Sequence, residues 1–202
     1  MNSKHADGPP VSESDLTLAI AERLRVHVAQ GGGTLDRLAN SIGVSPKTLN
    51  AIASGARAPS IELLWKIANA LGVPFGSLIA APARSGALVI RKSPDNVLSS
   101  RSGGFKSRAL MAFGESPRVE IYELTLAPGF AEESQAHAPG TSENIVVTKG
   151  SIEIISGREP PYRLEEGDAI HFDADIPHSY RNIGEDEATA HLVLAYADIR
   201  SA

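Results

Sequence analysis

The stretch TLDRLANSIGVSPKTLNAIASGAR, residues 34–57, decides the fold of the first half of the chain. Four of its apolar residues recur at helical spacing and predict one buried helix face: Leu35, Leu38, Ala39 and Ile42. Gly43 can adopt the left-handed conformation that ends such a helix. Ser45 can cap a second helix and Pro46 suits its first turn, so the stretch predicts two short helices joined by a tight turn.

The side chains on the outer face of the second helix are small or polar, and only one of them is basic. They belong to Lys47, Asn50, Ala51 and Ser54. Amide and ammonium groups can bond base edges in a major groove, and small side chains permit close approach. The same face would also suit an ordinary helical hairpin in water. The DNA-contacting residues that we expect are Thr34, Arg37, Ser45, Pro46, Lys47, Thr48, Asn50, Ala51, Ser54 and Arg57.

Three further helices are predicted around this pair. The first runs from about Asp15 to the glycines after Gln30, with four residues on its inner side: Leu16, Ile20, Leu24 and Val28. Residues 61–71 form another, capped by Ser60 and ended by Gly72, and its apolar stripe consists of Ile61, Leu64, Trp65 and Ala68. A last short helix follows Pro74, and Thr34 caps the helix of residues 35–42.

This five-helix pattern resembles the lambda repressor-like family, also called XRE or Cro-like, over about residues 15–80. The positions that carry the resemblance are Leu38-Ala39, Gly43-Val44-Ser45, Leu49, Ile52, Gly55, Pro59-Ser60, Leu64, Ile67-Ala68 and Ala70-Leu71. Ala53 departs from the family, which often has an acidic residue there; this affects local charge and leaves the expected fold unchanged. The resemblance implies a double-stranded DNA operator as partner.

Composition and charge limit the other possibilities. The chain of 202 residues has no cysteine, which excludes disulfides and thiolate metal sites. It lacks an apolar run of about 18 residues, so we expect no membrane span. Residues 1–14 are polar with no apolar core, which predicts a disordered arm and a cytoplasmic protein. Residues 1–82 carry a net charge of +1, residues 83–112 carry +5 and residues 113–202 carry −11, so DNA contact belongs to the N-terminal part.

After a predicted hinge at residues 81–86, the hydrophobic period changes from helical to two. The strand-like runs are GALVIRK, FKSRALMAF, RVEIYELTLAPG, NIVVTKGSIEIISG, DAIHFD and TAHLVLAY. Short strands separated by turn signals are typical of an all-β sandwich or barrel. We therefore expect a second domain over residues 87–202, which makes the chain an α domain followed by a β domain.

Two stretches of this second half resemble the cupin family: PGFAEESQAHAPGTSENIVVTKG and EEGDAIHFDADIPHSYRN. The matching residues are Glu143, Gly150, Gly167, His178 and Asn182, whereas Asp173 and Asp175 replace the Pro-x-Gly of the family's second motif. The resemblance covers about residues 86–198. It implies a double-stranded β-helix, or jelly-roll barrel, and a pocket that binds a small molecule or a metal.

The cupin metal ligands carry over incompletely, because one histidine of the family's His-x-His pair is missing. In one register the pair becomes Gln135 and His137, and in the other His137 and Pro139. Either way, His137, Glu143 and His178 are the candidate ligands, and Gln135 could add an amide oxygen. Such a set suits divalent iron, manganese, nickel or zinc. The alternative is a metal-free pocket in which these residues bond an organic ligand or each other.

Arg108 and Tyr122 lie on predicted strands and could face the same pocket, although packing or surface exposure would also explain them. The combined pattern predicts a transcriptional regulator that works as a homodimer through its cupin sheets, responds to an unidentified small-molecule effector or metal, and is not an enzyme. Two alternatives remain. One is a cupin metalloenzyme of dioxygenase or isomerase type fused to a DNA-binding domain, and the other is a barrel that only dimerises.

Overall fold

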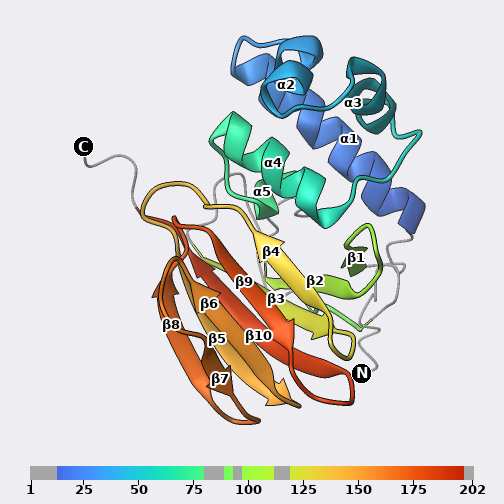
Figure 1. The fold of residues 1–202 in the computed structure, drawn as a ribbon. Helices are drawn as coiled ribbons and strands as arrows, with labels where there is room; N and C mark the ends of the chain where they lie inside the picture. Colours follow the sequence, from blue (N-terminus) through green and yellow to red (C-terminus); the bar gives the residue numbers. More distant parts are fainter. Residues whose placement is uncertain (1–12, 80–88, 93–96, 112–118, 198–202) are drawn as a thin grey trace, which may run out of the picture.

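The computed structural model describes residues 13–79, 89–92, 97–111 and 119–197. The helices are α1 (Glu13–Gln30), α2 (Leu35–Ser41), α3 (Pro46–Ala53), α4 (Ile61–Leu71) and α5 (Gly76–Ile79). The strands are β1 (Val97–Ser99), β2 (Phe105–Met111), β3 (Val119–Leu126), β4 (Ala131–Ser134), β5 (Ser142–Lys149), β6 (Ile152–Ser156), β7 (Tyr162–Leu164), β8 (Ala169–Asp173), β9 (His178–Asn182) and β10 (Ala188–Ala195). The helices gather at one end of a β-sandwich, as Figure 1 shows.

The helix ends follow the local signals of the sequence, with one exception. Thr34 and Ser45 cap α2 and α3 by accepting hydrogen bonds from the backbone N–H groups of Arg37 and Thr48. Gly43 and Gly72 take the left-handed conformation beyond α2 and at the end of α4. Ser60 occupies the predicted N-cap position of α4, but its side chain makes no capping hydrogen bond.

The core of the helical domain is formed by inward-facing residues of α1, α3 and α4. Its fully buried members include Ile20, Leu24, Leu49, Ile52, Leu64 and Ile67. Helix α1 begins at Glu13, slightly before the predicted start, and residues 1–12 of the predicted arm lie outside the described residues. No helix in the described part of the chain is both long and apolar enough to cross a membrane.

The β domain consists of two antiparallel sheets packed face to face. One has six strands in the order β1-β2-β3-β10-β5-β8, and the other has four in the order β4-β9-β6-β7. Alternate residues point into the space between the sheets, as in β10, where Ala188, Ala190, Leu192 and Leu194 are buried. This two-sheet arrangement confirms the predicted jelly-roll architecture.

Five of the six predicted strand runs contain strands, and the first does not. Residues 89–92 are not in a strand, and residues 86–88 of that run lie outside the described residues, as does the predicted hinge. Four strands were not predicted: β1, β4, β7 and β9. They are short and partly polar, and their sequences AEES and HSYRN in β4 and β9 carry no alternation of apolar residues.

The two domains meet through α4, α5 and one end of the barrel. The backbone N–H of Gly76, at the start of α5, donates to Glu120 Oε1 over 2.7 Å. The hydroxyls of Tyr122 and Tyr196 donate to Glu120 Oε2 over 2.7 and 2.9 Å, so both carboxylate oxygens of this fully buried residue are bonded. In α4, Asn69 Nδ2 donates to the carbonyl of Ala136 over 3.1 Å. These bonds fix the helical domain to one end of the barrel.

Candidate metal centre and interdomain cavity

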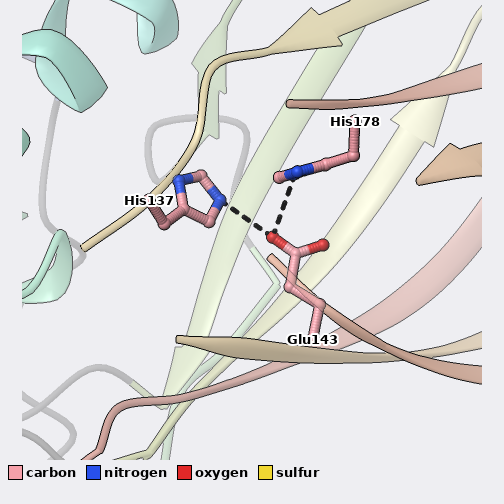
Figure 2. A group of neighbouring side chains, drawn as sticks. All are labelled: His137, Glu143 and His178. Atoms are coloured by element: carbon pink, nitrogen blue, oxygen red, sulfur yellow. Dashed lines mark hydrogen bonds and ion pairs between the residues drawn. The ribbon is translucent and has the colours of Figure 1, made fainter. Parts of the chain in front are cut away.

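Three buried side chains converge between the sheets, near the helical domain. His137 lies in the loop between β4 and β5, Glu143 is the second residue of β5, and His178 is the first residue of β9. Their ligand atoms all lie within 4.8 Å of one another. Figure 2 shows both imidazoles turned toward one oxygen of Glu143: Oε1 is 2.9 Å from His137 Nε2 and 3.5 Å from His178 Nε2.

Surrounding residues hold these three groups in place. The Tyr180 hydroxyl donates to Glu143 Oε2, and His178 Nδ1 lies 2.8 Å from the carbonyl oxygen of Ile176. The backbone N–H of His137 donates to the Ala174 carbonyl over 2.9 Å. Asp175, which departs from the family's Pro-x-Gly pattern, accepts from the Gly140 N–H over 2.9 Å. The departure therefore supplies a bond between the two loops that carry the histidines.

The negative charge of Glu143 and the positive charge of a protonated imidazole stabilise each other in this cluster. Burial alone would raise the pKa of Glu143, but the hydrogen bond from His137 and the positive charge of the two nearby imidazoles hold that pKa at about 2. Burial lowers the pKa of His178, yet its close approach and attraction to Glu143 outweigh burial and raise that pKa overall. The site therefore favours an ionised carboxylate next to two nitrogen ligands.

The arrangement fits a divalent metal ion. Because His178 Nδ1 faces a carbonyl, that nitrogen carries the proton and Nε2 presents its lone pair to the centre of the cluster. His178 Nε2 and His137 Nδ1 are buried without a hydrogen-bond partner. Ligand atoms bound at about 2.1 Å to one ion lie about 3.0–3.4 Å apart, which is close to the two measured distances.

A cavity of about 190 Å³ opens from this cluster toward the helical domain. From the helical side it is lined by Ile61, Glu62, Trp65, Lys66, Asn69 and Phe75. From the barrel it is lined by Phe105, Ser107, Tyr122, Leu124, Glu132, Glu133, Ser134, Gln135, His137, Glu143, Tyr180 and Leu192. Helix α4 thus forms one wall of this cavity.

The two residues expected in the pocket differ in their placement. Tyr122 lines the cavity, whereas Arg108 is not among its lining residues. Phe105 and Ser107 of the same strand face the cavity, so strand alternation turns Arg108 to the other side of the sheet, where it pairs with Glu123 over 3.1 Å. Gln135, the possible fourth ligand, is exposed and lines the cavity.

Trp65 is the residue of this site that sequence reasoning assigned to the helical core instead. Its indole stacks on the His137 ring with centroids 4.0 Å apart and on Phe75 at 4.3 Å. The apolar stripe of α4 is real, since Ile61, Leu64 and Ala68 are buried, but its edge faces the other domain. Helical spacing in the sequence shows which residues share a face of the helix. It does not show which domain packs against that face.

The residues expected to contact DNA lie on α3 and at the ends of α2 and α3. Thr34, Arg37, Ser45, Pro46, Lys47, Asn50, Ser54 and Arg57 are exposed, and Thr48 and Ala51 are half-buried. Asn50 Nδ2 donates to the Pro46 carbonyl over 2.9 Å, so its amide oxygen points away from that bond. The face of α3 opposite Leu49 and Ile52 is thus accessible to a partner.

Comparison with known proteins supports the family resemblance of both domains. The family model described as a helix-turn-helix matches residues 22–78, and the model described as a cupin domain matches residues 122–194. The HTH-type transcriptional regulator SutR of Escherichia coli (strain K12) is 30% identical over 167 residues, which cover 83% of this chain and 89% of that protein.

Solved structures agree over nearly the whole chain. The crystal structure of an HTH_3 family transcriptional regulator from Vibrio cholerae is 26% identical, with a TM-score of 0.71 over 93% of this chain and 100% of that chain. Hydroxypropylphosphonic acid epoxidase from S. wedmorenis is 20% identical with a TM-score of 0.45, covering 90% and 98% of the two chains, and a likeness this low carries no information on activity. The two family resemblances in the sequence are therefore confirmed, and the chain belongs to the helix-turn-helix transcriptional regulators with an N-terminal DNA-binding domain and a C-terminal cupin sensing domain.

Proposed function

We propose that this regulator senses a divalent metal ion held by His137, Glu143 and His178, together with a small-molecule effector in the adjoining cavity. The observation that carries the proposal is a fully buried carboxylate whose Oε1 lies 2.9 Å from His137 Nε2 and 3.5 Å from His178 Nε2, the second of which has no hydrogen-bond partner. Two imidazoles and one carboxylate suit divalent iron, manganese, nickel or zinc, and the metal would act as a Lewis acid toward an effector.

Metal content and affinity test this assignment. We expect the purified protein to bind about one divalent ion per chain by elemental analysis and calorimetric titration. His178→Ala should weaken that affinity by about 10–100-fold or more, since it removes a direct ligand. His171→Ala is the matched control, because His171 is an exposed histidine that bonds Asn144 outside the cluster. Equal metal affinity in the wild-type protein and His178→Ala would refute the site.

We further infer that the site is sensory and not catalytic. The relatives named above are regulators, which favours this interpretation over the metalloenzyme alternative. Metal ligands alone do not establish catalysis, and an enzyme would also need an acid or base matched to a substrate. Oxygen uptake by the iron-loaded protein with candidate small molecules should stay at the background rate, and sustained uptake would overturn this inference.

We also propose that the protein acts as a homodimer through the outer face of its six-stranded sheet. One reading helix contacts only a half-site, so two must be placed about one DNA turn apart. Val119 and Val146 on that face are 41% and 40% exposed. Light scattering after size exclusion should give twice the mass of one chain, and Val146→Glu should give the mass of one chain. A wild-type protein that elutes as a monomer would exclude this arrangement.

A further inference from the structure

The cavity between α4 and the barrel has an acidic lining. Beside Glu143 of the candidate metal centre, Glu62 comes from α4 and Glu132 and Glu133 come from β4, whereas Lys66 is the one lysine or arginine among the lining residues. Glu62 Oε1 accepts from the backbone N–H of Arg101 over 3.0 Å, but its Oε2 is buried without a hydrogen-bond partner. This oxygen can accept one more hydrogen bond or an ion pair.

Glu132 lacks a partner as well. The side chains of Glu132 and Glu133 make no hydrogen bond or ion pair with another residue in the described part of the chain. Burial, together with repulsion from Glu62 and Glu133, raises the pKa of Glu132 to about 7. A positive charge placed among these carboxylates would remove that repulsion.

Aromatic side chains form a large part of the remaining lining. Trp65 lies over His137, which is 6% exposed and has an unpartnered Nδ1, and Phe105 and Tyr180 stack with centroids 6.2 Å apart. The faces of such rings carry negative charge and attract cations, most strongly at the indole of tryptophan. Aromatic faces beside carboxylate oxygens that can still accept a hydrogen bond or an ion pair suit an organic cation.

We propose that the ligand of this interdomain cavity is a small organic cation that packs against the aromatic side chains that line the cavity and pairs with Glu62 and Glu132. The inference rests on the proposed function in treating this cavity as the effector site, and it adds the chemical class of the ligand. The size is sufficient, because a cavity of about 150 Å³ is known to hold benzene and this one is about 190 Å³. A ligand with one ring or its equivalent and one amine therefore fits.

Such a ligand contacts both domains at once. Glu62 and Trp65 belong to α4, whose buried residues Leu64 and Ile67 pack in the same core as Leu49 and Ile52 of α3. A ligand in the cavity can therefore shift α4, and with it the position of α3. This requires that the ligand bind one arrangement of α4 more tightly than another.

The chain contains its own reporter for the test, since Trp65 is its single tryptophan. The probes are benzylamine, benzyl alcohol and benzoate, which share a ring and differ in charge. They are titrated into the full chain after dialysis against a chelator, because a bound metal would attract benzoate. Benzylamine should change the Trp65 emission saturably and bind at least about tenfold tighter than the other two probes.

Two variants show whether the carboxylates are responsible. Glu132→Gln and Glu62→Gln should each weaken benzylamine about tenfold or more and leave benzyl alcohol unchanged, whereas the exposed Glu166→Gln should match the wild-type protein. Equal affinity for the three probes, tighter benzoate, or unchanged benzylamine binding in both variants would each overturn the proposal. The fluorescence readout needs neither metal nor DNA, so failure of the proposed metal site would leave this result interpretable.

Discussion

At the scale of single residues, Glu132 is held in an environment that opposes its charge. It is half-buried on β4 and has Glu62 and Glu133 as neighbours, and these factors raise its pKa to about 7. A glutamate in the unfolded chain titrates near about 4.3, so the folded protein holds this proton more tightly. A raised folded-state pKa favours folding while the group is protonated, and this contribution is lost as pH rises from about 4.3 through about 7.

The first prediction concerns Glu132→Gln. At pH 8 the variant should melt at a higher temperature than the wild-type protein, and near pH 4 the two should melt alike. The gain should stay below about 1 kcal/mol, because water screens this half-exposed side chain, which corresponds to a few degrees or less. Calorimetry at both pH values checks it, with Glu166→Gln as control. A variant that is less stable at pH 8 would contradict the assigned repulsion.

The sequence predicted individual residues well where their roles are local. The caps at Thr34 and Ser45 involve partners three residues away, so their spacing is visible in the chain. Trp65 and Glu132 acquire their roles from contacts across the domain boundary, and only the packed structure brings those partners together. Arg108, for which packing outside the pocket was the alternative, is turned to the other side of the sheet by the pleat of β2.

At the scale of elements, α3 divides its residues between a core and an accessible face. Leu49 and Ile52 are fully buried, while Lys47 and Asn50 are exposed on the side that is available to DNA. Strand β4 illustrates the opposite case, because its sequence AEES has no apolar alternation and its role as an edge strand comes from pairing with β9. The periodicity of apolar residues therefore predicted the helices and the longer strands. The short strands form because they pair with neighbouring strands, which the sequence pattern does not show.

The second prediction concerns the reading face of α3. Lys47→Ala should weaken operator binding about equally for related sequences and lower its dependence on salt, since a phosphate contact is lost. Asn50→Ala should cost about 1–3 kcal/mol of base discrimination. Gel-shift titrations on an operator found by genome-wide footprinting measure both effects. Arg163→Ala, whose side chain is 74% exposed on the barrel, provides a control for lost charge. Unchanged affinity in both variants would exclude α3 from DNA contact.

At the scale of the whole molecule, the two domains share buried polar bonds. Glu120 of the barrel accepts from Gly76 of the helical domain while two tyrosine hydroxyls bond its other oxygen. The bond between Gly76 and Glu120 crosses the boundary and contributes about 0.5–1.5 kcal/mol net, so it favours the joined arrangement of the domains. The metal site and the helices should therefore respond to each other.

The third prediction follows from this connection. Saturation with zinc at about a hundred times its Kd should raise the melting temperature of the helical circular dichroism signal by about 5–10 °C. All five described helices lie in the reading domain, so this signal reports on the domain without the metal. In Glu120→Gln the shift of the helical signal should be smaller, and in Glu166→Gln it should be unchanged. An unshifted helical signal in zinc-loaded wild-type protein would show that the domains melt independently.

Because α4 forms a wall of the cavity, exchanging one domain of this protein for that of another regulator would also change the ligand pocket. A biosensor built by joining this barrel to another regulator's reading domain would lose Glu62 and Trp65 from its pocket, and with them part of its ligand preference. A regulator made by exchanging domains would combine pocket residues from both original proteins, so its ligand specificity would differ from that of either. The two halves of the gene are therefore expected to change together when the recognised molecule changes.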